Sequence, residues 1–349
     1  MRSMKKTRTT SEPGRAPSAL AARAAPESGP DPATPQRATG LAGRDPIDTI
    51  TIAFGLVLAL GIGIRRGDAA LASGLVLANI VLALCARMAF PRLRAGRGAA
   101  RFFGVALPFL VFYVLYRELV LVLGWPDTRF FDAVVAGPEW ALWARTNPLA
   151  GPPWLGEVLA AAYMAYVPLL LVVVAVLGAR AACGPAAPAE ALARRICASW
   201  AFCYLVFLVV PVVGPRYVFP ALQASRLGPG PFSALAIFNQ YQGMLRGAAF
   251  PSAHVAATTV TVWSAWRWWP RGFRVVLPVA LALVAGAVYL GYHWLVDVAG
   301  GVLVGALVVA ADARIVRSAD ARTDAASPGD PAAQPPVASA SASHGGVRP

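Results

Sequence analysis

The sequence predicts an all-α fold, a polytopic membrane helix bundle of about eight transmembrane helices. Hydrophobic residues make up 57% of the 349 residues and charged residues only 14%, which is too apolar for a soluble globular chain. Apolar runs also recur at close to the ~20 residues with which an α-helix crosses a bilayer. The runs lie near residues 47–64, 69–90, 102–124, 155–178, 196–213, 253–269, 274–291 and 294–312.

The two ends of the chain lack such runs. Residues 1–45 are rich in Arg, Ala, Pro, Ser and Thr, and residues 314–349 in Ala, Pro and Ser. Because segments of this composition cannot bury a core, we expect two disordered tails, the first of them basic. Residues 46–100 would then hold two additional transmembrane helices, followed by a membrane domain of residues 101–313.

The formal charge of +14 does not indicate a nucleic-acid-binding protein. Most of the arginines lie in the tails and in short segments between apolar runs, which is typical of cytoplasmic loops in membrane proteins. Those in alternate loops are Arg92, Arg94, Arg97, Arg101, Arg180, Arg194, Arg195, Arg267, Arg271, Arg274, Arg314 and Arg317. We therefore expect both termini in the cytoplasm, and the two long connections, 125–154 and 214–251, on the opposite side.

Neither the cysteines nor the acidic residues predict a metal centre. The cysteines lie in or beside apolar runs without a C-x-x-C pair, and we interpret them as structural thiols. They are Cys85, Cys183, Cys197 and Cys203. The sequence also has no visible cluster of carboxylates that would bind a divalent cation. We therefore expect no cofactor.

Two histidines indicate chemistry. The chain has only three, and His344 belongs to the C-terminal tail. His254, in the sequence F-P-S-A-H, and His293, in Y-L-G-Y-H-W-L-V-D, both lie at the outer ends of predicted helices. Ionisable side chains in such positions are costly in a membrane and are functional by default.

His293 and Asp297 are four residues apart at the start of a predicted helix, so their side chains share one face. A carboxylate in this position can accept the imidazole N–H and raise the basicity of the other ring nitrogen. Such a pair can make the histidine a nucleophile or a base. Taken alone, the pair could equally serve only to cap or pack the helix.

A phosphate-binding site is indicated around Ser252. This residue precedes an apolar helix and is typical of an N-cap, which is a sufficient role for it by itself. A helix N-terminus also presents free N–H groups that bind anions such as phosphate, and His254 could protonate a leaving oxygen. Arg216 and Arg246 would supply positive charge, since Arg forms bidentate contacts with phosphate. Both arginines could instead bind lipid headgroups.

Taken together, these residues resemble the type 2 phosphatidic acid phosphatase superfamily. Its three motifs are a basic motif ending in Arg-Pro, then P-S-G-H, then S-R-x5-H-x3-D. Residues 251–254 read P-S-A-H and match the second motif, while His293 and Asp297 match the third. The first motif is reduced to Arg216. The resemblance covers residues 105–310 and implies a catalytic, phosphatidic acid phosphatase-like core of six helices.

Departures from these motifs resemble one branch. Gly286 and Ala287 stand where the third motif has Ser-Arg. The pattern F-P-S-x-H followed by Y-x3-H-x3-D, which begins its second part at Tyr289, resembles the inositol phosphorylceramide synthase-like branch and its bacterial relatives. Bacterial members often carry Arg where this chain has Gly291, so the site is expected to hold fewer cations than the phosphatase pattern.

The resemblance implies a metal-independent, two-step phosphoryl transfer. His293, oriented by Asp297, would attack phosphorus and form a phosphohistidine, and His254 would protonate the departing alkoxide and then activate the acceptor. The residues that would bind substrate are Arg216, Arg246, Ser252 and Tyr289. Water as the acceptor would make the enzyme a phosphatase. A lipid or polyol hydroxyl would make it a phosphotransferase, such as an inositol phosphorylceramide synthase-like head-group transferase.

The expected substrate is a phospholipid or an isoprenoid (di)phosphate at the extracytoplasmic face of a bacterial inner membrane; the oligomeric state stays open. A transporter is the main alternative class, yet the apolar runs lack the midplane charges and paired broken helices of transporters. A Ser–His intramembrane protease using Ser252 and His293 would need a G-x-S-x-G-like turn, which P-S-A does not supply. A non-catalytic member of the superfamily is a further alternative.

Overall fold

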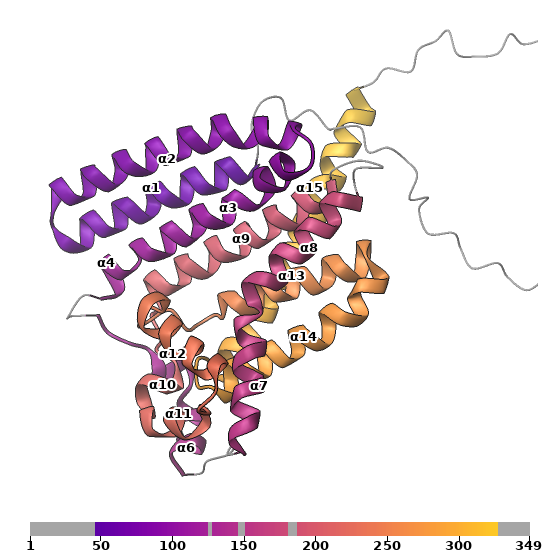
Figure 1. The fold of residues 1–349 in the computed structure, drawn as a ribbon. Helices are drawn as coiled ribbons and strands as arrows, with labels where there is room; N and C mark the ends of the chain where they lie inside the picture. The colour runs from indigo at the N-terminus through magenta and orange to yellow at the C-terminus, as the bar shows by residue number, and fades with distance from the viewer. Residues whose placement is uncertain (1–45, 125–127, 146–150, 181–186, 327–349) are drawn as a thin grey trace, which may run out of the picture. The chain divides into compact units, whose positions relative to one another are not determined.

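The computed structural model describes residues 46–124, 128–145, 151–180 and 187–326. Within these ranges the chain is helical, and extended segments pair only in an isolated parallel bridge between Val212 and Ala248. The predicted all-α fold is therefore confirmed, and Figure 1 shows the helices as a bundle. The predictions for Cys183, His344 and the tail residues 1–45 and 327–349 lie outside the described residues.

Each of the eight predicted apolar runs coincides with a helix or a helix pair. These are α1 (Pro46–Arg66), α2 (Ala69–Ala95), α3 (Ala99–Glu118), α7 (Pro153–Met164) with α8 (Tyr166–Arg180), α9 (Ala187–Val209), α13 (Ala253–Trp268), α14 (Pro270–Tyr289) and α15 (Leu295–Ala326). Across the described ranges, five stretches are long and apolar enough to cross a membrane, or six if the bent pair α7–α8 counts as one span. Since α13 has 16 residues and the apolar part of α1 is shorter still, eight crossings stay a prediction.

Shorter helices occupy the long connections. α4 (Val120–Leu123) follows α3 directly, α5 (Asp132–Val135) and α6 (Gly137–Arg145) precede α7, and α10 (Pro215–Val218), α11 (Pro220–Arg226) and α12 (Pro231–Gly243) precede α13. In Figure 1, α6, α10, α11 and α12 gather at one end of the bundle. α15 continues beyond residue 313, where the sequence places the end of the membrane domain, because the following Ala- and Arg-containing residues favour a helix.

α2 presents an apolar surface to its surroundings. Leu77, Val81 and Leu84 are each more than half exposed, although they lie in a helix that is long enough to span a bilayer. Large aliphatic side chains in such numbers are stable outside the protein core only where the neighbouring medium is itself apolar. Together with the apolar length of the helices, this makes the chain an integral membrane protein.

α13 packs against α8, α9, α14 and α15. Two glycines of α15 bring it close to the backbone of α13. A Cβ atom at Gly301 would lie 2.6 Å from the carbonyl oxygen of Ser252, and one at Gly305 would lie 2.7 Å from that of Ala256. Glycine permits this approach, as small residues commonly do between membrane helices. The close contact brings together the start of α13, which carries His254, and the start of α15, which follows His293 by two residues.

Charged side chains join the other ends of these helices, and two of them, Arg195 and Asp312, are buried. The Nε atoms of Arg194 and Arg195, both on α9, each lie 2.7 Å from a carboxylate oxygen of Asp312 on α15. The guanidinium of Arg195 also lies over the ring of Trp263 on α13. α13 and α15 are therefore joined near both ends, and α9 is joined to them at this end.

Candidate active site

Ser252 closes the N-terminus of α13. Its Oγ accepts a hydrogen bond from the backbone N–H of Val255 at 3.3 Å, and its own N–H donates to the carbonyl oxygen of Asp297 at 3.0 Å. The residue is fully buried and is not part of the cavity wall described below. The predicted N-cap is thus present, and its second contact joins the start of α13 to the first turn of α15.

A turn between α14 and α15 carries His293. Gly291 has a φ of +71°, a left-handed conformation that glycine adopts without strain. Its carbonyl accepts from the N–H of Arg216 at 2.8 Å, and the N–H groups of Tyr292 and His293 both donate to Ala287. The turn therefore places the segment after α9 beside the imidazole of His293. It also explains physically why glycine occupies this position.

The imidazole of His293 is held by two acceptors. Its Nδ1 lies 3.1 Å from the carbonyl oxygen of Ala249 and 3.4 Å from Oδ2 of Asp297. Because a carbonyl oxygen can only accept, Nδ1 carries the proton and Nε2 keeps its lone pair. Burial, assisted by the charge of Arg216, lowers the pKa of the His293 imidazole to about 3, so the ring is neutral at physiological pH.

Asp297 is fully buried in the first turn of α15. Its Oδ2 accepts from the backbone N–H of Trp294 at 2.8 Å in addition to facing His293. Its Oδ1 has no hydrogen-bond partner in the described part of the chain. The carboxylate is therefore placed to face any positive charge that develops on the imidazole, as the i,i+4 spacing predicts.

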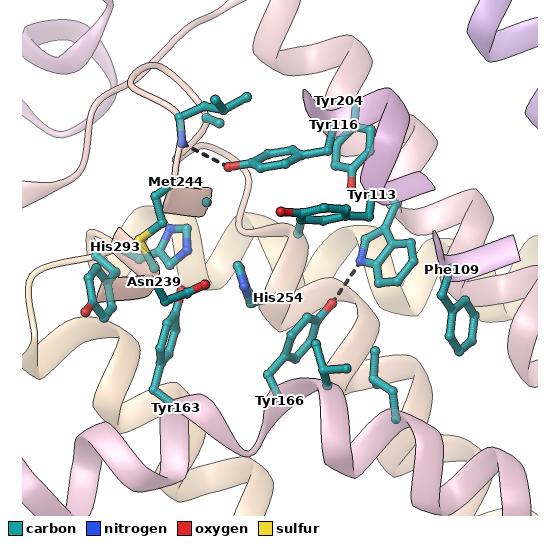
Figure 2. Close-up of a pocket in the computed structure, with 18 of the residues that line it drawn as sticks. Phe109, Tyr113, Tyr116, Tyr163, Tyr166, Tyr204, Asn239, Met244, His254 and His293 are labelled. Carbon is teal, nitrogen blue, oxygen red and sulfur yellow. Dashed lines mark hydrogen bonds between the residues drawn. The ribbon is translucent and has the colours of Figure 1, made fainter. Parts of the chain in front are cut away.

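His254 projects from the first turn of α13 into the same space. Its ring lies 4.4 Å from the ring of Tyr166, 5.2 Å from that of Tyr163 and 6.0 Å from that of His293, centre to centre. Both histidines line one cavity of about 570 Å³. Figure 2 shows His254 near the middle of this cavity, with His293 and Tyr163 on one side and Tyr166 on the other.

Arg216 is buried in the same wall. Its guanidinium lies over the rings of Tyr217 and Tyr292, donates to the hydroxyl of Tyr217 at 3.1 Å and contacts the sulfur of Met244. Its Nε has no hydrogen-bond partner among the residues with described positions. Of the described residues that line the cavity, Arg216 is the only one that is always charged.

Like Ser252, two further predicted binding residues lie outside the cavity wall. Arg246 is exposed, with its guanidinium over the ring of Phe130, and is not part of the cavity wall. Tyr289 is buried in a cluster against α7 and is likewise absent from the wall. A spacing of four residues would place Tyr289 and His293 on one helical face, but α14 ends at Tyr289 and the turn at Gly291 redirects the chain.

Two carboxylates that the sequence does not single out support the site. Oδ2 of Asp132 accepts from the backbone N–H of Val213 at 3.0 Å, and the indole N–H of Trp294 donates to the carbonyl of Val213 at 2.8 Å. Both oxygens of Glu139 accept from the N–H of Leu295 at 2.8 Å, so Glu139 caps α15 from another segment. Burial raises the pKa of both carboxyl groups. Their only sequence signal is acidity within a Trp-rich, apolar stretch.

The part of the chain that the structure describes contains no group of three or more His, Cys, Asp or Glu side chains that could hold a metal ion. The chemistry that its geometry offers comes from a neutral imidazole with a free Nε2, a second imidazole facing the same cavity and one guanidinium. A nucleophile, a proton donor and a cation are the groups that a phosphoryl transfer requires.

Comparisons with known proteins give one family. No curated protein and no solved structure was found to match the chain. Residues 135–311 match the family model described as the PAP2 superfamily, and this range contains His254, His293, Asp297 and Arg216. Since the matched range covers just over half of the 349 residues, the chain belongs to the PAP2 superfamily.

Proposed function

We propose that this protein is a lipid phosphatase or phosphotransferase that acts on a phospholipid or isoprenoid (di)phosphate through a phosphohistidine at His293. Membership of the PAP2 superfamily supports a phosphatase- or phosphotransferase-type lipid enzyme. The observation that carries the finer proposal is the convergence of His293, His254 and Arg216 on one cavity.

In the first step, Nε2 of His293 attacks phosphorus. The N–P bond forms, the bond from phosphorus to the leaving oxygen breaks, and His254 gives that oxygen a proton. A bound phosphate favours the protonated form of His254 by its negative charge. The positive charge that develops on the His293 ring is stabilised by the Asp297 carboxylate and the Ala249 carbonyl, which both face Nδ1.

In the second step, His254 removes a proton from the acceptor hydroxyl or water. The acceptor oxygen attacks phosphorus, the N–P bond breaks and His293 returns to its neutral form. Throughout, Arg216 and the free N–H groups at the start of α13 bind the non-bridging oxygens, where negative charge concentrates.

We place the site at the extracytoplasmic face of a bacterial inner membrane. The support is the distribution of arginines. Arg194 and Arg195 pair with Asp312 at the end of the bundle that is one length of α13 away from His254, and the basic loops lie on that side by sequence. Basic loops favour the cytoplasmic side, which supports our placement of the histidines at the other face.

A head-group transferase of the inositol phosphorylceramide synthase-like kind is the second candidate. One observation favours it. At positions 286 and 287, where the third motif of the superfamily has Ser-Arg, the structure has no space for larger side chains. Ala287 is fully buried, and a Cβ at Gly286 would lie 2.6 Å from the carbonyl oxygen of Leu159. With Arg216 as the one cation in the described cavity wall, the site matches the single charge of a phosphodiester better than a diphosphate.

The deciding experiment uses the purified full-length protein in detergent with a chelator present. A panel of phosphatidate, a phosphodiester phospholipid and isoprenyl diphosphate is incubated with and without polyol acceptors, and free phosphate and new lipid are both measured. We expect turnover by the wild type and by His344→Ala, which serves as the matched histidine control, but none by His293→Ala. A phosphate label trapped on the wild type should be stable to alkali, labile to acid and absent from His293→Ala. Turnover that persists in His293→Ala would overturn the assignment of the nucleophile.

A further inference from the structure

The turn that carries His293 is held by the segment that follows α9. The carbonyl oxygens of residues 289–291 lie at the C-terminal end of α14, where a helix has no donors of its own. Each of them accepts a hydrogen bond from α10 or α11. In order, the donors are Nη1 of Arg226 at 2.9 Å, Nε2 of Gln223 at 3.0 Å and the backbone N–H of Arg216 at 2.8 Å. The main chain that leads to His293 is therefore held at three successive positions.

Arg226 is a buried cation at the end of α14. The residue is 1% exposed, and its guanidinium lies 4.5 Å from the centre of the Trp143 ring and 5.3 Å from that of Tyr289. Burial lowers the pKa of Arg226 to about 10, so the group is charged at neutral pH. Positive charge is favoured at the C-terminus of a helix, where the helix dipole is negative. Since Arg226 is not part of the cavity wall, any effect that it has on the site passes through the residues that it contacts.

Gln223 lies three residues before Arg226 and shares this face of α11. It is also buried. Besides the carbonyl of Leu290, its Nε2 donates to Oε1 of Gln240 on α12 at 3.0 Å, so both protons of this nitrogen are used. The short stretch from Arg216 to Arg226 thus carries the cation of the cavity wall at one end. At its other end it carries the side chains that hold the turn before the histidine.

We propose that Arg226 and Gln223 are positioning residues, which align His293 with a phosphate that is bound by Arg216. The inference rests on the proposed function, because it assumes that His293 attacks phosphorus. Without the two side chains the turn loses two of its three outside bonds, whereas the N–H of Arg216 still donates to Gly291. Phosphate binding should then persist while the attacking nitrogen is less well aligned. A misplacement of about 1 Å can lower a rate about a hundredfold, so the effect should fall on kcat rather than on KM.

The test uses the purified full-length protein with phosphatidate as the probe. Arg226→Ala and Gln223→Met, which is similar in length but has no donor, should each lower kcat by about tenfold to a hundredfold with KM nearly unchanged. Arg226→Lys keeps a charge and a donor at the end of α14 and should recover part of kcat. The matched control on α11 is Ser225→Ala, because Ser225 is exposed and its hydroxyl donates only to Leu222. A fall confined to KM, or an equal fall of kcat in the control, would overturn the inference.

A single-turnover measurement separates positioning from a loss of folded protein. The rate constant of phosphohistidine formation does not depend on the fraction of molecules that are folded, whereas the amplitude does. We expect the rate constant to fall in Arg226→Ala and Gln223→Met. A lower amplitude with an unchanged rate constant would make both residues merely structural and would contradict the proposal. Gln223→Met leaves the buried charge of Arg226 in place, so it keeps the test decisive if Arg226→Ala does not fold.

Nitrogen NMR of the imidazoles gives a readout that does not require turnover. The chain has only three histidines, so ¹⁵N-histidine labelling yields few signals, and His293→Ala identifies those of His293. In Arg226→Ala and Gln223→Met the His293 signals should shift or broaden, while those of His344 stay unchanged. Such shifts in a protein whose wild type is inactive would contradict the catalytic proposal alone. Unchanged His293 signals in both variants would contradict the positioning role, whatever the activity of the wild type.

Discussion

The Nδ1 atom of His293 lies 3.1 Å from the carbonyl oxygen of Ala249. A backbone carbonyl cannot donate, so this contact fixes the imidazole tautomer without the help of any side chain. Asp297, at 3.4 Å from the same nitrogen, is therefore not needed to select the tautomer. In the proposed mechanism, its contribution is the negative charge that faces the ring when phosphorus is bound to Nε2.

Asp297→Asn should therefore lower kcat less than it would if Asp297 also selected the tautomer of His293. We expect a fall of about tenfold to a hundredfold in kcat with KM nearly unchanged, because the missing charge acts in the transition state. Asparagine keeps an oxygen that can accept from the N–H of Trp294, so the fold should be retained. Steady-state kinetics beside a thermal unfolding scan test this, and a change confined to KM would argue against it.

Substitutions of Arg216 and Arg246 should differ sharply in their effect on kcat/KM, although the sequence predicts that both residues bind phosphate. Arg216→Ala should lower kcat/KM by about a hundredfold or more, the usual effect of removing one preorganised donor to a developing oxyanion. Arg216→Lys keeps the charge but loses the planar guanidinium, so its kcat/KM should lie between those of the wild type and Arg216→Ala. Arg246→Ala should leave kcat/KM nearly unchanged, because its side chain is exposed and outside the cavity wall. A comparable loss in both alanine variants would contradict this placement.

Asp132→Ala should affect both stability and substrate binding. It leaves the buried N–H of Val213 without its carboxylate partner, which costs about 1–3 kcal/mol of unfolding free energy. Since Val213 lies three residues before Arg216, we also expect KM to rise more than kcat falls. Asp132→Asn, which offers an amide oxygen to the same N–H, should restore most of both properties. Failure of asparagine to restore them would assign Asp132 a role through its charge.

The stability of the protein should depend on pH through His293. Its pKa is lowered to about 3 by burial and by the charge of Arg216, whereas an unfolded histidine titrates near the ordinary value of about 6.5. Between these values the unfolded chain binds more protons than the folded chain, so stability falls as the pH is lowered through this window. The unfolding temperature of the wild type should therefore drop more between pH 6.5 and pH 4 than that of His293→Gln. Parallel curves would contradict a buried, neutral His293.

The sequence predicts those features that depend on neighbouring residues. The eight apolar runs coincide with helices because the length and composition of a run are local properties. The N-cap at Ser252 and the facing of His293 and Asp297 follow from spacings of three and four residues, and both are present. The superfamily is confirmed by the match of residues 135–311.

What the sequence does not predict depends on turns and on distant contacts. Tyr289 lies outside the cavity because the left-handed turn at Gly291 interrupts the helical spacing to His293. The bonds from Glu139 to Leu295 and from Asp132 to Val213 join residues 156 and 81 positions apart. No local pattern encodes contacts over such separations, which arise only when the bundle has formed.

The glycine contact between α13 and α15 has a consequence for how the site can vary. Because Gly301 and Gly305 lack side chains, α15 approaches the backbone of α13 closely beside His254, and the turn that carries His293 leads directly into α15. The 6.0 Å separation of the two imidazole rings therefore depends on this close approach of the two main chains. Substitutions elsewhere in the cavity can reshape the space for different lipids without altering that gap, so one catalytic pair can serve a changing range of molecules.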